Sequence, residues 1–163
     1  LDRGAAPGSW SLGAAERVGA QGRVLACDIQ STVTVFPPNV EFHQEDVFRR
    51  SEAFERQLAE TGPFHVVMSD MAPQTTGTKF TDQARSLELC LEALAVAEKY
   101  LVKGGSFVVK IFMGPDVGEL LKGMRPRFAR VTSFKPQSSR VESKETFFVG
   151  LGFKGKEADG ARD

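Results

Sequence analysis

The chain has 163 residues, 41% of them hydrophobic, and its acidic and basic side chains balance to a formal net charge of zero. This length fits one globular domain with a sizeable core, and the balanced charge neither requires nor excludes a nucleic-acid partner. No apolar run reaches the roughly 18 residues of a membrane span, and Cys27 and Cys90 both lie in apolar segments, which predicts buried free thiols rather than a disulfide framework or a zinc site.

Apolar runs and helical patterns alternate along the chain. Strands are predicted at residues 1–2, 23–28, 40–43, 64–69, 106–111, 128–134 and 146–151. Helices are predicted at residues 9–18, 48–60, 81–101 and 116–124, with Thr81 as N-cap of the third and Gly104-Gly105 ending it. Such alternation is typical of a doubly wound α/β fold, a parallel sheet covered on both faces. A domain at 1–153 followed by a loose polar tail at 154–163 is expected.

The last two predicted strands differ from the others in how they are connected. Only residues 135–144 join them, which is too short for a helical crossover, so this pair is predicted to be antiparallel. The final strand would then start at the edge where the parallel strands end. In doubly wound sheets that edge is where ligands bind.

Three ionisable residues stand at the ends of apolar runs. They are Asp70 after residues 64–69, Lys110 after residues 106–109, and Glu145 before residues 146–149. A charge beside a buried run is costly unless it is paired, solvated or functional. Taken singly, each has an ordinary explanation: a snorkelling lysine, a loop cap, or a surface glutamate. Together, on one sheet edge, they predict a site with two carboxylates and an amine.

A glycine-rich loop at residues 4–10 follows the first strand and enters the first helix. Small residues let a ligand approach the backbone, and a helix N-terminus offers free N–H donors, although the dinucleotide spacing G-x-G-x-x-G is absent. Asp28 ends the next strand, where an acidic residue commonly binds a ribose diol, and Asp46 follows the third strand. Glycine loop, Asp28 and Asp46 together favour an adenosine-type ligand. Trp10 is either a ligand contact or a core residue.

Several ordered motifs resemble those of the FtsJ/RrmJ family of RNA ribose 2′-O-methyltransferases. They are residues 1–11 (LDRGAAPGSWS), 26–28 (ACD), 68–73 (MSDMAP), 104–110 (GGSFVVK), 135–136 (KP), and 138–140 (SSR) running into 143–145 (SKE). The resemblance implies a Rossmann-like S-adenosylmethionine-dependent methyltransferase fold, with a mostly parallel seven-stranded sheet and an antiparallel last strand. Arg3, where the family usually has an apolar residue, and Ser9, where it has glycine, depart from the pattern.

The resemblance also implies site residues. The positions that match cofactor-binding ones are Gly4, Gly8, Trp10, Asp28, Asp46 and Asp70. Asp70, Lys110 and Glu145 match three members of a Lys-Asp-Lys-Glu tetrad, with Lys110 either the base that removes the 2′-hydroxyl proton or a cation that stabilises the alkoxide. The first lysine of the tetrad lies upstream of the glycine loop, so we expect the chain to be a fragment. No metal is expected.

The implied substrate is a uridine ribose of large-subunit (23S) ribosomal RNA, either naked or in the ribosomal subunit, in the cytoplasm of a bacterium or, alternatively, in a mitochondrion. A monomer without membrane contact is expected. From residue 110 to residue 144 the chain has eight Lys or Arg and three Asp or Glu. Phosphate contacts near the carboxyl edge are predicted for Arg125, Arg127, Arg130, Lys135, Arg140 and Lys144, and Ser138-Ser139-Arg140 either holds a phosphate or forms a polar turn. Phe80 and Phe112 either stack on a base or pack.

Two other functions remain open at the level of sequence. One is a methyltransferase of another acceptor, such as an mRNA cap or a small molecule. The other is a noncatalytic RNA-binding module that kept the fold and lost turnover.

Overall fold

A computed structural model of the chain describes residues 1–136 and 144–156. The strands are β1 (Asp2–Arg3), β2 (Val24–Asp28), β3 (Val40–Gln44), β4 (Phe64–Ser69), β5 (Leu101–Phe112), β6 (Phe128–Phe134) and β7 (Glu145–Phe153). The helices are α1 (Ser9–Val18), α2 (Glu52–Thr61), α3 (Lys79–Tyr100) and α4 (Val117–Met124). The predictions on Ser138, Ser139 and Arg140, and on the tail beyond residue 156, lie outside the described residues.

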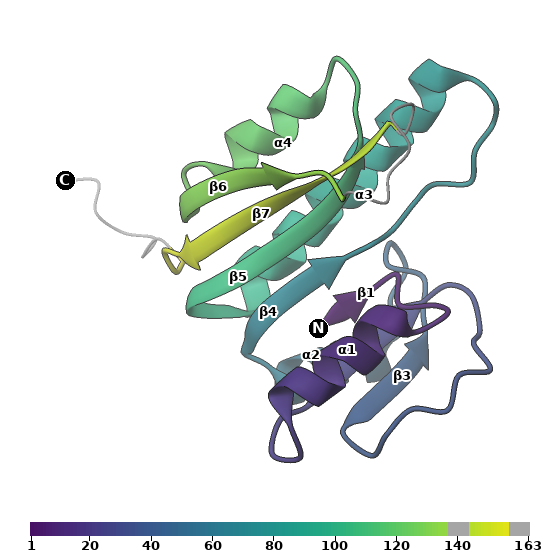
Figure 1. Ribbon diagram of the computed structural model, residues 1–163, viewed down its shortest axis with the longest axis vertical. Coiled ribbons are helices and arrows are strands. Elements are labelled where there is room, and N and C mark those ends of the chain that lie inside the picture. The colour runs from purple at the N-terminus through teal and green to yellow at the C-terminus, as the bar shows by residue number, and fades with distance from the viewer. Residues whose placement is uncertain (137–143, 157–163) are drawn as a thin grey trace.

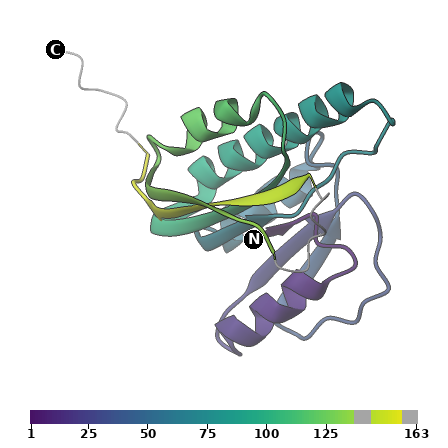
Figure 2. The ribbon, with the colours of Figure 1, turned by 45° about the horizontal axis from the view of Figure 1, so that its top comes forward.

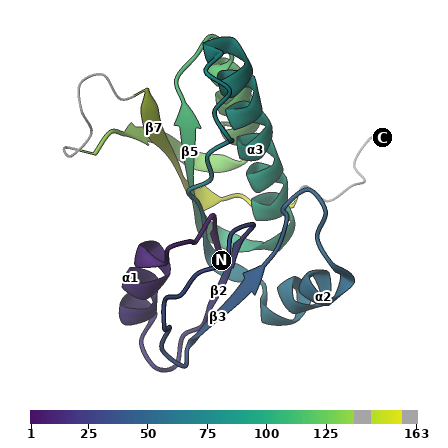
Figure 3. The same ribbon diagram turned by 90° about the vertical axis from the view of Figure 1, so that its right-hand side faces the viewer.

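The strands form one seven-stranded sheet in the order β3-β2-β1-β4-β5-β7-β6. Helix α1 covers one face, and α2, α3 and α4 cover the other (Figures 2 and 3). The first five strands are parallel to one another, whereas β7 lies antiparallel between β5 and β6. In Figure 1 the arrow of β7 accordingly points against those of β4 and β6. The predicted doubly wound fold with an antiparallel last strand is confirmed.

The core lies between the sheet and the α2, α3 and α4 layer. Side chains alternate across a strand, and in β5 the residues that face the helices are fully buried: Phe107, Val109 and Ile111. Each buried side chain of this size stabilises the fold by about 1.5–3 kcal/mol relative to exposure. The intervening side chains of β5 point to the opposite face, which leaves Lys110 available for a role outside the core.

Two helix boundaries differ from the prediction. Helix α2 begins at Glu52, four residues late, because the Ser51 hydroxyl accepts the backbone N–H of Phe54 at 3.1 Å and caps the helix there. Helix α3 begins after Thr78 rather than Thr81.

The prediction that Gly104-Gly105 ends α3 is wrong. Helix α3 ends at Tyr100, and β5 starts at the next residue because Leu101 already pairs with Phe64. The pairing register then shifts before Ser106. Gly104 lies in this irregular stretch of the strand with a φ of 85°. A glycine adopts this conformation easily, and here it allows an irregularity of the strand rather than the end of a helix.

Arg3 is 2% exposed and pairs with Glu92 of α3. Glu92 also contacts Arg50 at 2.5 Å, and Arg50 contacts Glu55 at 2.5 Å. The buried charge of Arg3 is therefore paired with a carboxylate of α3. Because Glu92 also contacts Arg50, and Arg50 contacts Glu55 of α2, this pairing connects β1 to α2.

Both cysteines are free and buried, as predicted. Among the helices of the described residues, none is long and apolar enough to cross a membrane.

Candidate active site

The three strand-end charges meet at the carboxyl edge of the sheet. Lys110 Nζ lies 2.9 Å from Asp70 Oδ1 and 3.8 Å from Glu145 Oε1. The Lys110 side chain is 12% exposed, whereas those of Asp70 and Glu145 are 31% and 44% exposed. The prediction that the antiparallel last strand brings Glu145 to Asp70 and Lys110 is confirmed.

The register of the central strands explains this convergence. Glu145, the first residue of β7, pairs with Phe112, and Lys110 pairs with Phe147. Because alternate residues share a face, Lys110 and Glu145 both lie on the face away from α3. Helix α3 fixes this part of β5 from behind: the Cys90 thiol donates to the Lys110 carbonyl at 3.1 Å, and the Ser86 hydroxyl accepts the Phe112 N–H at 2.9 Å.

The glycine loop passes directly beside Asp70. Gly4 has a φ of 77°, and a Cβ there would lie 2.7 Å from the Asp70 carbonyl oxygen, so only glycine fits without displacement of the β4 end. Behind the loop, the Ser11 hydroxyl donates to Asp2 at 2.6 Å, and burial raises the pKa of that carboxyl. These contacts fix the loop between β1 and α1.

A cavity of 610 Å³ lies beside this loop, a size typical of small-molecule sites. Four of the predicted cofactor-binding residues line it, namely Gly4, Asp28, Asp46 and Asp70. Further carboxylates of the lining are Glu45 and Glu88, and its larger apolar side chains are Ile29, Val47, Phe48, Met71 and Leu89. An acidic cavity with an apolar wall suits a ligand that combines a positive charge, hydroxyl groups and a flat ring.

The carboxylate of Asp28, which lines this cavity, accepts two backbone hydrogen bonds. Its Oδ2 accepts the Ala6 N–H at 2.9 Å, and its Oδ1 accepts the Gln30 N–H at 2.8 Å. Each carboxylate oxygen keeps capacity for a second hydrogen bond. The side chain is thus oriented by the backbone and can still accept hydroxyl groups from a ligand.

Gly8 and Trp10 are not among the residues that line the cavity. The hydroxyls of Thr32 and Thr34 donate to the Pro7 carbonyl, so this segment folds over Gly8, where a Cβ would lie 2.8 Å from Phe36. The Trp10 ring instead packs against Phe147 of β7, with 5.4 Å between centroids.

Arg85 and Glu88 of α3 also line the cavity and were not predicted as site residues. Arg85, Glu88 and Leu89 are spaced i, i+3 and i+4, so they form one face of the helix. That spacing was readable in the sequence, but nothing in it showed which face of α3 meets the glycine loop.

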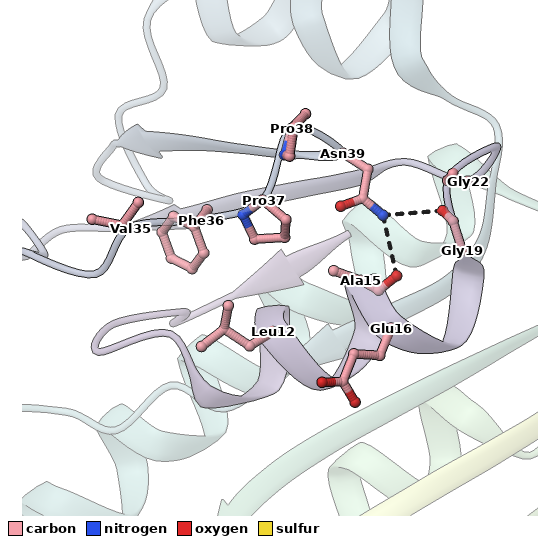
Figure 4. Close-up of a pocket in the computed structure, with 11 residues that line it drawn as sticks. Leu12, Ala15, Glu16, Gly19, Gly22, Val35, Phe36, Pro37, Pro38 and Asn39 are labelled. Atoms are coloured by element: carbon pink, nitrogen blue, oxygen red, sulfur yellow. Dashed lines mark hydrogen bonds between the residues drawn. The ribbon is translucent and has the colours of Figure 1, made fainter.

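A second cavity, of 920 Å³, lies between α1 and the segment before β3 (Figure 4). Among the described residues that line it, Glu16 alone has an ionisable side chain. The Asn39 side-chain amide donates to the carbonyls of Ala15 and Gly19, at 3.1 and 3.0 Å, and thereby joins the two walls. This cavity lacks the paired charges found at the carboxyl edge.

The prediction of phosphate contacts near the carboxyl edge is wrong in the placement of Arg125, Arg127 and Arg130. They lie around the start of β6, where Phe128 pairs with Phe153 at the far end of β7 from Glu145. Arg127 there contacts Glu98 at 2.9 Å. Lys135 and Lys144 do lie at the carboxyl edge, because one follows the end of β6 and the other precedes β7. Within residues 1–136 and 144–156 no group of His, Cys, Asp or Glu forms a metal site.

Comparisons with known proteins agree with this geometry. The sequence model of FtsJ-like methyltransferases matches residues 1–153. A ribosomal RNA large subunit methyltransferase E from Nitratidesulfovibrio vulgaris (strain Miyazaki F) is 74% identical over the whole chain, which covers 80% of that protein.

Solved structures share the fold. A putative ribosomal RNA methyltransferase from Plasmodium falciparum superposes with a TM-score of 0.80 at 26% identity, over 96% of this chain and 86% of that one. Human methyltransferase-like protein 13, in complex with SAH, superposes with a TM-score of 0.58 at 14% identity, over 99% of this chain and 73% of that one.

Proposed function

The chain belongs to the FtsJ-like methyltransferase family, and from this premise we propose that it methylates a ribose 2′-hydroxyl of large-subunit ribosomal RNA, most directly a uridine of the 23S RNA. The methyl donor is S-adenosylmethionine. The observation that carries the proposal is the position of Asp70, which lines the 610 Å³ cavity and contacts Lys110 at 2.9 Å. One side chain thus joins the donor cavity to the amine that would face the acceptor.

The residues of the cavity fit S-adenosylmethionine. The backbone-oriented Asp28 carboxylate would accept the ribose hydroxyls, and Asp46 would meet the adenine amino group beside the apolar wall. The carboxylates of Asp70 and Glu88 suit the positive charges of the ligand, and Arg85 suits its carboxylate. Gly4 lets the backbone approach closely. For Gly8 and Trp10 the proposed role is indirect, through the shape of the loop and the first turn of α1.

S-adenosylmethionine, when bound, supplies a methyl group already activated by attachment to a positively charged sulfur. The protein must orient the acceptor hydroxyl and assist the loss of its proton. Lys110 is the proposed base: its nitrogen, in the neutral form, accepts the 2′-hydroxyl proton. Asp70, just after β4, lies within hydrogen-bond distance of this nitrogen at 2.9 Å and orients the amine, and Glu145 of β7 lies 3.8 Å from it. Both carboxylates stabilise the ammonium that forms.

RNA as the acceptor is supported by the names of the relatives and by the chemistry of the site. The 2′-hydroxyl distinguishes RNA from DNA, and the two carboxylates beside the amine stabilise the ammonium that it becomes when it takes up the hydroxyl proton. We assign the catalytic domain to residues 1–153. We further propose that the protein acts as a monomer without membrane contact. A bacterial cytoplasm is the proposed location, because the relative at 74% identity is a bacterial ribosomal RNA methyltransferase.

The proposal is tested by incubation of the full-length protein with methyl-labelled S-adenosylmethionine and ribosomal RNA, followed by nuclease mapping. Label on a 2′-oxygen of the large-subunit RNA is the expected result. Label on a base, or transfer only to an mRNA cap or a small molecule, would contradict it. RNA binding without transfer by wild-type protein would favour the noncatalytic module.

A further inference from the structure

Next to Glu145 two adjoining cavities lie outside the donor cavity. The inner one, of 420 Å³, is lined by Thr75, Lys79, Asp82, Gln83, Phe112, Lys144 and Glu145. The outer one, of 590 Å³, is lined by Lys79, Phe80, Gln83, Met113, Gly114, Pro115 and Lys144. They share Lys79, Gln83 and Lys144, so two lysines stand on the boundary between them. Figure 1 shows that the start of α3, the end of β5 and the start of β7 meet on this side of the molecule.

The inner cavity borders the proposed catalytic group. Glu145 lines it and contacts Lys110 at 3.8 Å. An acceptor ribose presented to Lys110 therefore has its neighbours in the RNA chain close to this cavity.

The outer cavity has the chemistry of a base-binding platform. Phe80 is 69% exposed and Met113 is 44% exposed, and with Pro115 they form an apolar surface in an otherwise polar region. Every nucleobase has a flat face that stacks on an aromatic ring, so such a surface binds bases with little sequence preference.

This surface is held in place by neighbouring hydrogen bonds. The Gln83 side chain donates to the Met113 carbonyl at 2.8 Å, and the Met113 N–H donates to the Lys144 carbonyl at 2.6 Å. Gly114 packs so closely on Gln83 that a Cβ there would lie 2.6 Å from it. Helix α3, the end of β5 and the start of β7 are thereby joined at one point.

The preceding turn is fixed in the same way. Asp82 accepts the backbone N–H of Thr76 at 2.8 Å and its hydroxyl at 2.9 Å. The backbone hydrogen bond from Thr76 lowers the pKa of the Asp82 carboxyl. Asp82 is thus committed to the turn, whereas Lys79 forms no ion pair with a carboxylate of the described residues and can meet a phosphate.

We propose that the outer cavity binds the base of a nucleotide adjacent to the acceptor, with Phe80 stacked on it and Lys79 and Lys144 on the linking phosphate. This inference rests on the proposed function and extends it to the mode of substrate recognition. It makes a single-stranded segment of RNA, rather than an isolated nucleoside or a duplex, the form in which the acceptor is presented.

Binding of a fluorescent single-stranded RNA oligonucleotide to full-length protein, measured by anisotropy over a series of salt concentrations, tests the inference. Phe80→Ala should raise the dissociation constant about tenfold, and Phe80→Trp should restore affinity because stacking tolerates any aromatic ring. Lys79→Ala and Lys144→Ala should each reduce the slope of log affinity against log salt by about 0.7, the value for one lost contact to a single strand.

Matched controls lie on distant surfaces. Leu151→Ala removes a partly exposed apolar side chain from the far end of β7, and Lys122→Ala removes an exposed lysine from α4. Both should leave RNA binding unchanged. Affinity for S-adenosylmethionine should stay constant in all these variants, because neither Phe80 nor the two lysines line the donor cavity.

The outcomes separate the two proposals. If wild-type protein methylates RNA but Phe80→Ala binds it as Leu151→Ala does, the base platform is refuted and the proposed function stands. If wild-type protein binds RNA through Phe80 without methyl transfer, the platform is supported and the proposed function fails. The base platform would also be refuted if wild-type protein did not bind RNA. The same holds if it bound a polyglutamate peptide, which is negatively charged but has no bases, as tightly as it binds RNA.

Discussion

Replacement of Lys110 by methionine and by arginine separates the two chemical roles open to this side chain. Methionine has no charge and no basic nitrogen, whereas arginine keeps the positive charge and cannot act as a base. Lys110 Nζ lies 2.9 Å from Asp70 Oδ1 and 3.8 Å from Glu145 Oε1, so each variant changes the group between both carboxylates. If Lys110 is the base, Lys110→Met and Lys110→Arg should both lose methyl transfer.

Both Lys110 variants are expected to lose methyl transfer while the free energy of unfolding changes little. Removal of a positioned base lowers the rate about 10²- to 10⁴-fold, which corresponds to roughly 3–5 kcal/mol of activation free energy. The free energy of unfolding should change by less than about 1 kcal/mol, because solvent screens the remaining carboxylates of Asp70 and Glu145, which are 31% and 44% exposed.

The assay is single-turnover transfer of labelled methyl to ribosomal RNA by full-length protein saturated with S-adenosylmethionine, with urea unfolding in parallel. Lys122→Met, at a position 79% exposed on α4, is the matched control and should keep full activity. Activity of Lys110→Arg above about a tenth of wild type, with Lys110→Met inactive, would refute the base and assign Lys110 the role of a cation at the developing alkoxide.

Four further predictions concern the donor cavity, a buried ion pair and the thiols. Asp28→Ala should raise the dissociation constant for S-adenosylmethionine, measured by calorimetry, about ten- to 100-fold, and an unchanged affinity would exclude Asp28 as a ligand. Glu92→Ala leaves Arg3 buried without its carboxylate, so urea unfolding should show a loss of about 3–5 kcal/mol; a loss below about 0.5 kcal/mol, the range of surface substitutions, would disprove this account. Burial raises the pKa of Cys27 to about 11 and that of Cys90 to about 12, so a thiol reagent at about pH 8 should label both only after unfolding. These thiols ionise less readily in the folded than in the unfolded protein. Their contribution to the free energy of unfolding is therefore complete below the ordinary thiol pKa of 9.0 and declines as the pH rises towards 11 and 12. A free energy of unfolding that increases over that pH range would contradict this prediction.

The strands and the meeting of the three charges were predictable because they depend on local pattern and connection length. Residues 64–69 and 128–134 were predicted with the bounds that the structure has. The short link before Glu145 was enough to predict the direction of β7. Neither inference required knowledge of distant side chains.

What the sequence did not predict depends on contacts between distant segments. The end of α3 is decided by the pairing of Leu101 with Phe64 rather than by a nearby glycine. Gly8 is covered by the segment around Phe36, whose position no periodicity reveals. Arg127 lies at the opposite end of the strands from Glu145 because of the strand register, which cannot be read from amino-acid composition.

The position of β7 has a consequence for how the protein is made. Among the described strands β7 is synthesised last, yet it lies between β5 and β6. Asp70 and Lys110 are synthesised before this strand, but the second carboxylate, that of Glu145, reaches Lys110 only when β7 is in place. Domains generally fold as units during synthesis. The site formed by Asp70, Lys110 and Glu145 is thus expected only once β7 has been synthesised and has taken its place in the sheet.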